Sequence, residues 1–427
     1  AFYGCYPSVV KIYASEPPKM LDTYLGNRAE AIYVPEQSIP KYESAANWSK
    51  WKGKYKALSD GDSPEPPTPD GKNIQFKDSA VKAICVSNWD KDGDGELSYE
   101  EAADVRTIGS AFSRSTDIRS FKEFEYFTGL SSVPDNGFCD CRYLIDIKLP
   151  PNVLRIGDNA FSGCSNLCLT ELPEGLKDIG YGAFRGCDKI RLTSLPETLT
   201  SIGSDAFSGC NNITLTKLPP LLTSIAPGIF QGSNGVLPEE LPSGVVSIGG
   251  SAFRGISKLN LKKLPDGLKF IGGQAFDLCE TLALTELPSG LTTIESSAFK
   301  RCKNLRLKSL PPGLTKIDNE TFVDCVSLEF TSLPETVTEI GKMAFMDCAF
   351  KKMTIPSGVV RIGEDAFKGC ESLKVVDVLA KDPPVMDDIY IGEYADVIYV
   401  PSASLEKYRT APGWSQWKDK IQPIASE

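Results

Sequence analysis

The sequence predicts an α/β repeat solenoid, and three features of the 427-residue chain lead to this fold class. The dipeptide Ala-Phe returns at a fixed interval through the middle of the chain. Short stretches of alternating apolar and polar residues return at the same interval. A proline follows each stretch and would end a strand, because proline has no N–H for a sheet ladder. Repetition at one period is typical of stacked coils rather than of a single globular core.

The repeat unit is 23 residues long and reads L-P-x-x-L-x-x-I-G-x-x-A-F-x-G-C-x-x-L-x-L-x-x, as in residues 172–194. Its Leu-x-Leu pair predicts a half-buried strand. Its Leu-x-x-Ile stretch predicts a second short extended segment, and Ala-Phe-x-Gly-Cys predicts a turn with the phenylalanine inside. About eleven coils would span roughly 50 Å at the usual strand spacing. The phenylalanine position is filled by Phe138, Phe161, Phe184, Phe207, Phe230, Phe253, Phe276, Phe299, Phe322, Phe345 and, after a 22-residue step, Phe367.

Nine of the thirteen cysteines share one repeat position, which Ser233 and Ile256 occupy in two other coils. A catalytic thiol would stand alone, and a zinc site would show closely spaced cysteine pairs. We therefore interpret the series as a buried ladder of small apolar side chains, in which the position requires volume rather than bonding. The series consists of Cys141, Cys164, Cys187, Cys210, Cys279, Cys302, Cys325, Cys348 and Cys370.

The repeat unit resembles the BspA-type (Treponema pallidum-type) leucine-rich repeats of bacterial surface proteins, over roughly residues 130–380. The resemblance implies a leucine-rich-repeat solenoid, a right-handed coil with a parallel sheet on one face. It also implies an exported, extracellular protein at a bacterial cell surface, used for adhesion or ligand capture. The partner would be a protein or glycan of the host or matrix surface, which the resemblance does not identify.

Composition excludes several classes of function. The chain has no histidine, which removes Ser-His-Asp and Cys-His nucleophiles and histidine metal sites. A net charge of -10 disfavours nucleic acid and anionic membranes as partners. No apolar run is long enough for membrane insertion and no signal peptide is visible, so we expect any targeting segment to lie upstream or to have been removed. We expect no enzymatic activity.

Residues 90–101 have the pattern of a single EF-hand calcium loop. Converging carboxylates would repel one another without a cation, so we predict calcium as the cofactor. We expect helices over residues 76–89 and 100–108 and, since no second loop is visible, a structural clip rather than a switch. An acidic surface turn is the alternative. The predicted metal ligands are Asp90, Asp92, Asp94, Glu96 (through its backbone carbonyl), Ser98 and Glu101.

The two ends of the chain are copies of each other. Residues 12–58 align without gaps onto residues 378–424, and each copy follows an Ala-Phe-x-Gly-Cys sequence. A solenoid needs units that cover its last apolar coil, so we interpret the module as a C-terminal cap. The alternative is a carbohydrate platform built from its paired tryptophans. We expect the first copy to follow an upstream array, or its half-coil to dock elsewhere.

Five parts of the chain are therefore expected, with short helices in the EF-hand segment and small α+β caps. They are a cap module preceded by a half repeat (1–58), a proline-rich linker (59–73), an EF-hand-like calcium module (74–110), the solenoid (111–377) and a C-terminal cap module (378–427).

The exposed positions of the Leu-x-Leu stretches form the predicted binding surface. They are mostly small, polar or basic. We expect a non-enzymatic cell-surface adhesion protein that engages host or matrix macromolecules. The alternatives are a stalk that presents another domain, a solvated face with no ligand, and a carbohydrate-binding component of a surface glycan-uptake system. The candidate ligand-binding residues are Arg191, Asn260, Lys262, Arg306 and Lys308.

Overall fold

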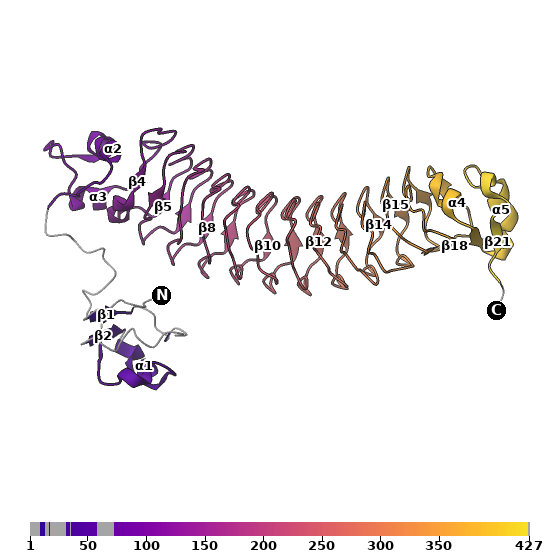
Figure 1. Ribbon diagram of the computed structural model, residues 1–427, viewed down its shortest axis with the longest axis horizontal. Helices are drawn as coiled ribbons and strands as arrows, with labels where there is room; N and C mark the ends of the chain where they lie inside the picture. The colour runs from indigo at the N-terminus through magenta and orange to yellow at the C-terminus, as the bar shows by residue number, and fades with distance from the viewer. Residues whose placement is uncertain (1–8, 13–16, 18–30, 35, 58–71, 426–427) are drawn as a thin grey trace. The chain divides into compact units, whose positions relative to one another are not determined.

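The computed structural model describes residues 9–12, 17, 31–34, 36–57 and 72–425. The chain divides into two compact units, residues 1–71 and residues 72–427. The longer unit is a stack of coils, with two helices at its N-terminal end and two at its C-terminal end (Figure 1). This confirms the predicted repeat solenoid.

Each coil contributes a short strand to a parallel ladder. Neighbouring strands pair one repeat apart, as Asp178 with Ser201 and Ile179 with Ile202. The isoleucine is buried and the residue before it points outward. The ladder consists of three four-stranded sheets: β5 Ser132–Val133, β7 Arg155–Ile156, β8 Asp178–Ile179 and β9 Ser201–Ile202; β10 Ser224–Ile225, β11 Ser247–Ile248, β12 Phe270–Ile271 and β13 Thr293–Ile294; β14 Lys316–Ile317, β15 Glu339–Ile340, β17 Arg361–Ile362 and β19 Val385–Met386.

The regular ladder therefore lies on the Leu-x-x-Ile stretches, whereas the sequence placed the main strand on Leu-x-Leu. The Leu-x-Leu stretches keep the expected alternation of buried and exposed residues. They pair more sparsely, as in the bond from the N–H of Arg191 to the carbonyl of Leu169 and the bonds from the N–H groups of Arg306 and Lys308 to the carbonyls of Leu284 and Thr285. The chain turns at the proline soon afterwards, so few N–H groups are left to extend the pairing. Paired strands on this side occur at the ends, as β4 Ser120–Phe121 with β6 Asp146–Ile147.

Phenylalanine rings run through the interior as one stack. From Phe138 to Phe345, the centroids of neighbouring rings are 5.2 to 6.0 Å apart and their planes lie within 23° of parallel. All of these rings are buried. Each coil therefore covers the apolar side of the next, which a single coil could not do alone.

The cysteine ladder is buried as predicted, and its position also supplies a hydrogen-bond donor in every coil that has cysteine or serine there. Each thiol donates to the carbonyl oxygen of the phenylalanine in the preceding coil, at 3.1 Å for Cys302 and Phe276. Ser233 makes the same bond to Phe207 at 2.7 Å. Ile256 supplies volume without a donor. Serine thus replaces the thiol as a hydrogen-bond donor. This corrects the interpretation that the position requires volume rather than bonding.

Two residues in each coil adopt a left-handed backbone, which explains the small residues around Ala-Phe. One position holds Gly163, Gly186 and Gly209, and holds Asp324 and Asp347 in later coils, all with φ between 57° and 76°. Glycine accepts this conformation without a steric cost, and aspartate is among the residues that tolerate it best. The tight turns after each phenylalanine depend on these positions.

The C-terminal end of the array is closed by a four-stranded parallel sheet and two short α-helices. Asp388 joins this cap to the last coil, because its buried carboxylate accepts N–H bonds from Phe367, Tyr390 and Ile391. The elements are β16 Lys352–Ile355, β18 Val375–Val378, α4 Tyr390–Tyr394, β20 Val397–Val400, η4 Ser402–Ser404, α5 Leu405–Thr410, η5 Ser415–Trp417 and β21 Ile421–Pro423.

The shorter unit contains a three-stranded parallel sheet with a helix after its second strand. Its paired tryptophans, Trp48 and Trp51, are buried, as are Trp414 and Trp417 in the C-terminal cap. Buried rings cannot offer a face to a sugar, so these tryptophans pack the core. The elements are β1 Val9–Lys11, β2 Ala31–Val34, η1 Glu36–Ser38, α1 Ile39–Ser44, η2 Ser49–Trp51 and β3 Tyr55–Ala57.

The twelve described cysteines are free thiols, and we expect two rates of reaction with a thiol reagent at pH 8. Cys139 and Cys168 are partly exposed and should react within the folded protein. Burial raises the pKa of the seven ladder thiols from Cys187 to Cys370, to about 12 for Cys210, so thiolate should be scarce there. These seven thiols should react only after denaturation, in a time course with and without guanidinium. Disulfides between ladder cysteines, or fast reaction of all of them, would contradict this.

Candidate calcium loop and binding face

Two helices flank the predicted loop, and both are shorter than the sequence suggested. Helix α2, Ser79–Trp89, begins after Asp78, whose carboxylate caps it by accepting the N–H groups of Ala80 and Val81. Asp78 is extended rather than helical, which delays the start from residue 76. Helix α3, Tyr99–Asp104, ends early because Val105 and Ile108 turn into the solenoid core.

The helical module and the solenoid share one hydrophobic core. The Trp89 ring packs 6.0 Å from Phe112 and 5.7 Å from Phe127, centroid to centroid. The carboxylate of Asp78 also accepts the backbone N–H groups of Arg119 and Ser120. The module therefore covers the first coil, adjoining β4 and the 3-10 helix η3 Lys122–Tyr126.

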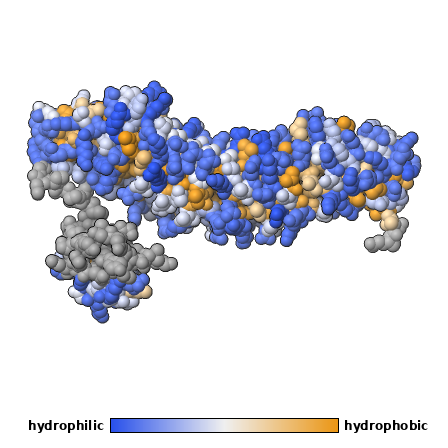
Figure 2. All heavy atoms as spheres, in the orientation of Figure 1, coloured by the Kyte–Doolittle hydropathy of each residue, from blue (hydrophilic) through white to orange (hydrophobic). Residues whose placement is uncertain are grey.

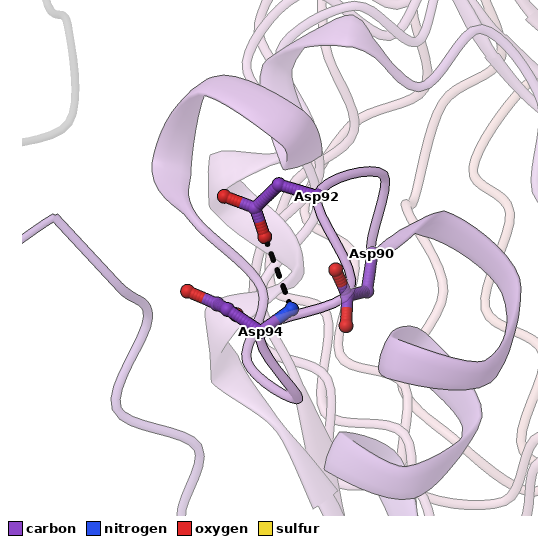
Figure 3. Close-up of side chains that lie close together, drawn as sticks. All are labelled: Asp90, Asp92 and Asp94. Carbon is purple, nitrogen blue, oxygen red and sulfur yellow. Dashed lines mark hydrogen bonds between the residues drawn. The ribbon is translucent and has the colours of Figure 1, made fainter.

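The loop brings three of the predicted ligands together. Carboxylate oxygens of Asp90, Asp92 and Asp94 lie within 4.8 Å of one another. Figure 3 shows them on one tight loop, with the N–H of Asp94 donating to Asp92 at 3.2 Å. Asp90 accepts the N–H groups of Gly93 and Gly95, whose φ angles are +74° and +82°. The glycines permit the turn that makes the aspartates converge.

The other predicted ligands are placed differently. The Glu96 side chain pairs with Lys82, which leaves its backbone carbonyl for the role predicted. Ser98 caps α3, and its hydroxyl donates to Glu101 at 2.7 Å. Glu101 also accepts the N–H of Lys91 at 2.7 Å and lies outside the group of three aspartates. Burial would raise the pKa of Glu101, but these N–H bonds, with those of Ser98 and Asp92, lower it to about 2.

A short segment before α2 pairs with the loop. Asn73 forms an antiparallel bridge with Ser98, and the N–H of Ile74 donates to Leu97 at 2.8 Å. This segment thus provides hydrogen-bond partners for backbone groups of the loop, in place of a second EF-hand loop. The Lys72 ammonium lies 3.0 Å from Asp92 and offsets part of the negative charge. The sequence analysis missed Lys72 and Asp78; an aspartate directly before a helical stretch is a recognisable capping signal for Asp78.

The five candidate ligand-binding residues are all exposed, but they form separate groups. Asn260 and Lys262 contact Glu239, at 2.7 and 3.6 Å. Arg306 and Lys308 lie on one Leu-x-Leu stretch, on either side of buried Leu307. Arg191 holds the Arg306 position five coils earlier, about 24 Å away at the usual strand spacing. Arg191, Arg306 and Lys308 make no ion pair with any residue that the structure describes.

A surface depression of about 500 Å³ lies on the turns of neighbouring coils. Burial, and then the charge of Asp324, raise the pKa of Asp347. Both aspartates hold the left-handed position that is glycine elsewhere, so the turn geometry accounts for them. The depression contains no thiol or hydroxyl nucleophile. Its lining residues are Lys300, Arg301, Glu320, Val323, Asp324, Met343, Met346 and Asp347.

The visible face of the longer unit is mostly hydrophilic, with small, separate apolar patches (Figure 2). Partners on this face would therefore be recognised through polar and charged groups. No helix among residues that the structure describes is long and apolar enough to cross a bilayer.

Stacked coils with a period of 23 residues and capped ends define the class of leucine-rich-repeat solenoids. The chain belongs to the BspA-type leucine-rich repeat family, whose model matches six copies over residues 106–237, 238–349 and 338–381. This confirms the resemblance that the repeat unit suggested.

Among solved structures similar to this chain, one aligns closely enough to support the fold. A leucine-rich repeat protein from Bacteroides ovatus aligns with a TM-score of 0.54 and 22% identity, over 83% of this chain and 91% of that one. A leucine rich cell surface protein from Faecalibacterium prausnitzii aligns with a TM-score of 0.39 and 24% identity, over 70% of this chain and 84% of that one. The Treponema pallidum leucine rich repeat protein aligns with a TM-score of 0.28 and 28% identity, over 43% of this chain and 78% of that one. No curated protein sequence matches the chain significantly.

Replacing Asp78 by alanine should lower the free energy of local unfolding at the N-terminal end of the solenoid by about 2 kcal/mol at pH 7. The substitution removes a helix cap and two long-range hydrogen bonds. Burial alone would raise the pKa of Asp78, but four N–H bonds lower it from 3.8. Its stabilisation is therefore complete above pH 3.8 and is lost as pH falls through the lower folded pKa. Hydrogen exchange of residues 74–110 across pH would measure this.

The matched control is Asp117→Ala, which removes an exposed aspartate whose side chain contacts Thr116. It should leave exchange in residues 74–110 unchanged. A difference between Asp78→Ala and the wild type that stays constant down to pH 2 would contradict the role of the carboxylate.

Proposed function

We propose that this chain is a non-enzymatic protein of a bacterial cell surface, whose solenoid binds a host or matrix protein or glycan. Arg306 and Lys308 carry the proposal. They are exposed and unpaired on a regular face of a protein whose net charge is -10. Unneutralised cations on such a background favour partners with acidic groups, through both encounter rate and orientation. The surface location is supported by the family and by the name of the Faecalibacterium protein.

Binding is a better-supported role than catalysis. The chain has no histidine, and burial raises the pKa of ladder thiols such as Cys210 and Cys370. The aspartates in the surface depression are explained by turn geometry. A stalk that presents another domain is the second candidate, and the continuous core from Ile74 to Ile421 favours it. Such a core would hold a distal domain at a fixed distance.

We further propose that the loop binds one calcium ion as a structural clip. Asp90, Asp92 and Asp94 would hold the ion, with the backbone carbonyl of Glu96. Calcium prefers such oxygen ligands, and its charge would relieve the repulsion among the three carboxylates. Ser98 and Glu101 already bond to each other, so their part is to fix the start of α3 unless they reorient. Because Trp89 packs in the solenoid core, ion binding would stabilise the first coil.

Calcium should raise the thermal stability of residues 74–110. With a dissociation constant on the order of 10⁻⁴ to 10⁻³ M, 10 mM calcium would add roughly 1.4 to 2.7 kcal/mol. Terbium emission sensitised by Trp89, the residue before Asp90, would report binding directly. Asp90→Asn with Asp92→Asn should abolish the signal, and Asp117→Asn should not. Absence of any calcium or terbium effect on the wild-type protein would refute the site.

Charge reversal at Arg306 and Lys308 should weaken binding about tenfold or more, or 1.4 kcal/mol, if they contact the partner. The full chain is tested against immobilised matrix proteins, mucins and sulfated glycans, with calcium and with chelator. The control is Lys177→Glu with Lys269→Glu, which makes the same change in charge at exposed positions beside the β-ladder. Equal weakening by both pairs would reject the local site, and no binding by the wild type would favour the stalk.

A further inference from the structure

The unit near the N-terminus reproduces the C-terminal cap element by element. Strands β1, β2 and β3 lie 366 positions before β18, β20 and β21, and α1 lies 366 before α5. The strand registers also agree, since Val9 pairs with Ala31 as Val375 pairs with Val397. The two modules therefore share one topology and register.

The cores of the two modules are packed alike. The rings of Tyr42 and Trp48 meet edge to face at 5.1 Å and 85°, and those of Tyr408 and Trp414 at 5.0 Å and 82°. All four rings are buried. This pair of rings is thus packed in the same way in both copies, although Tyr55 stands in the first core where Ile421 stands in the second.

The two copies also differ at the outer edge of the first strand. In the C-terminal module, β18 is covered by β16 of the repeat array, from Lys352 opposite Val375 to Ile355 opposite Val378. Asp377 adds contacts across this junction, at 2.8 Å to Lys352 and 3.2 Å to Thr354. Strand β1 takes the place of β18 in the other copy, and no strand among the described residues pairs with its outer edge. Such an edge presents unpaired N–H and C=O groups to another strand.

We propose that residues 9–57 form the C-terminal cap of a second leucine-rich-repeat array in the same polypeptide, whose last coil covers β1. The occupant is a repeat coil because a repeat coil covers the same edge in the C-terminal copy. A coil of the same chain is favoured because the sequence Ala1–Cys5 matches the Ala-Phe-x-Gly-Cys motif that precedes β18 at residues 366–370. The polypeptide would then carry two separately capped solenoids joined by the proline-rich linker.

A cap exchange within the full chain tests whether this module accepts a repeat coil. Residues 375–423 are replaced by a second copy of residues 9–57, which has the same length, and Lys11→Asp in the graft keeps the partner of Lys352. The comparison variant ends at residue 374 and leaves β16 uncovered. The matched control is the graft with Trp48→Ala and Trp51→Ala, which should behave like the truncated variant.

We expect the exchange to restore hydrogen-exchange protection of β16 to within about tenfold of the wild type. Amides of the grafted β1 should be protected, while those of the original β1 in the same molecule exchange quickly. A graft that behaves like the truncated variant, although its own core amides at residues 31–34 are protected, would overturn the proposal. Concentration-dependent protection of the original β1 would also overturn it, and would assign that edge to a second copy of the chain.

Discussion

The structure depends on the stacking of each coil on its two neighbours. A 23-residue coil has too little interior of its own, so its phenylalanine, isoleucine and leucine side chains are buried by the next coil along. The parallel phenylalanine rings and the thiol–carbonyl bonds repeat this contact at every step, as between Phe276 and Phe299 and between Cys302 and Phe276. Because no coil is stable by itself, both ends of the array must be covered.

The two ends are covered by unrelated structures that use the same polar device. At the N-terminal end, Asp78 accepts N–H groups from the start of α2 and from Arg119 and Ser120. At the C-terminal end, Asp388 accepts N–H groups from the start of α4 and from Phe367. Each aspartate satisfies backbone groups that the stacking pattern leaves without a partner. Each cap therefore covers the apolar surface of the terminal coil and is also held in a fixed position on it by these hydrogen bonds.

The proposed functional residues are departures from the repeat rather than parts of it. Positions that face the interior hardly vary along the array, since their neighbours fix their size and shape. The outward positions beside the buried leucines vary freely, and there Arg306 and Lys308 carry charge without a partner. The proposed calcium loop also lies outside the repeat, on a helical segment that shares the core of the solenoid. Binding properties can thus change while the stack is preserved.

The sequence by itself determined the period, the solenoid, the family, the duplicated module and the aspartates of the loop, because these follow from residue types at fixed spacing. Only the tertiary structure decided that the regular ladder lies on the Leu-x-x-Ile stretches. Both kinds of stretch alternate buried and exposed residues, so the sequence pattern does not show which of them is fully hydrogen-bonded to its neighbours. Contacts between distant residues were equally hidden. The hydrogen bond of the cysteine position, the bond of Asp78 to Arg119, and the pairing of Lys262 with Glu239 join residues 23 to 41 positions apart. Spacing within one repeat does not indicate which atoms meet across coils.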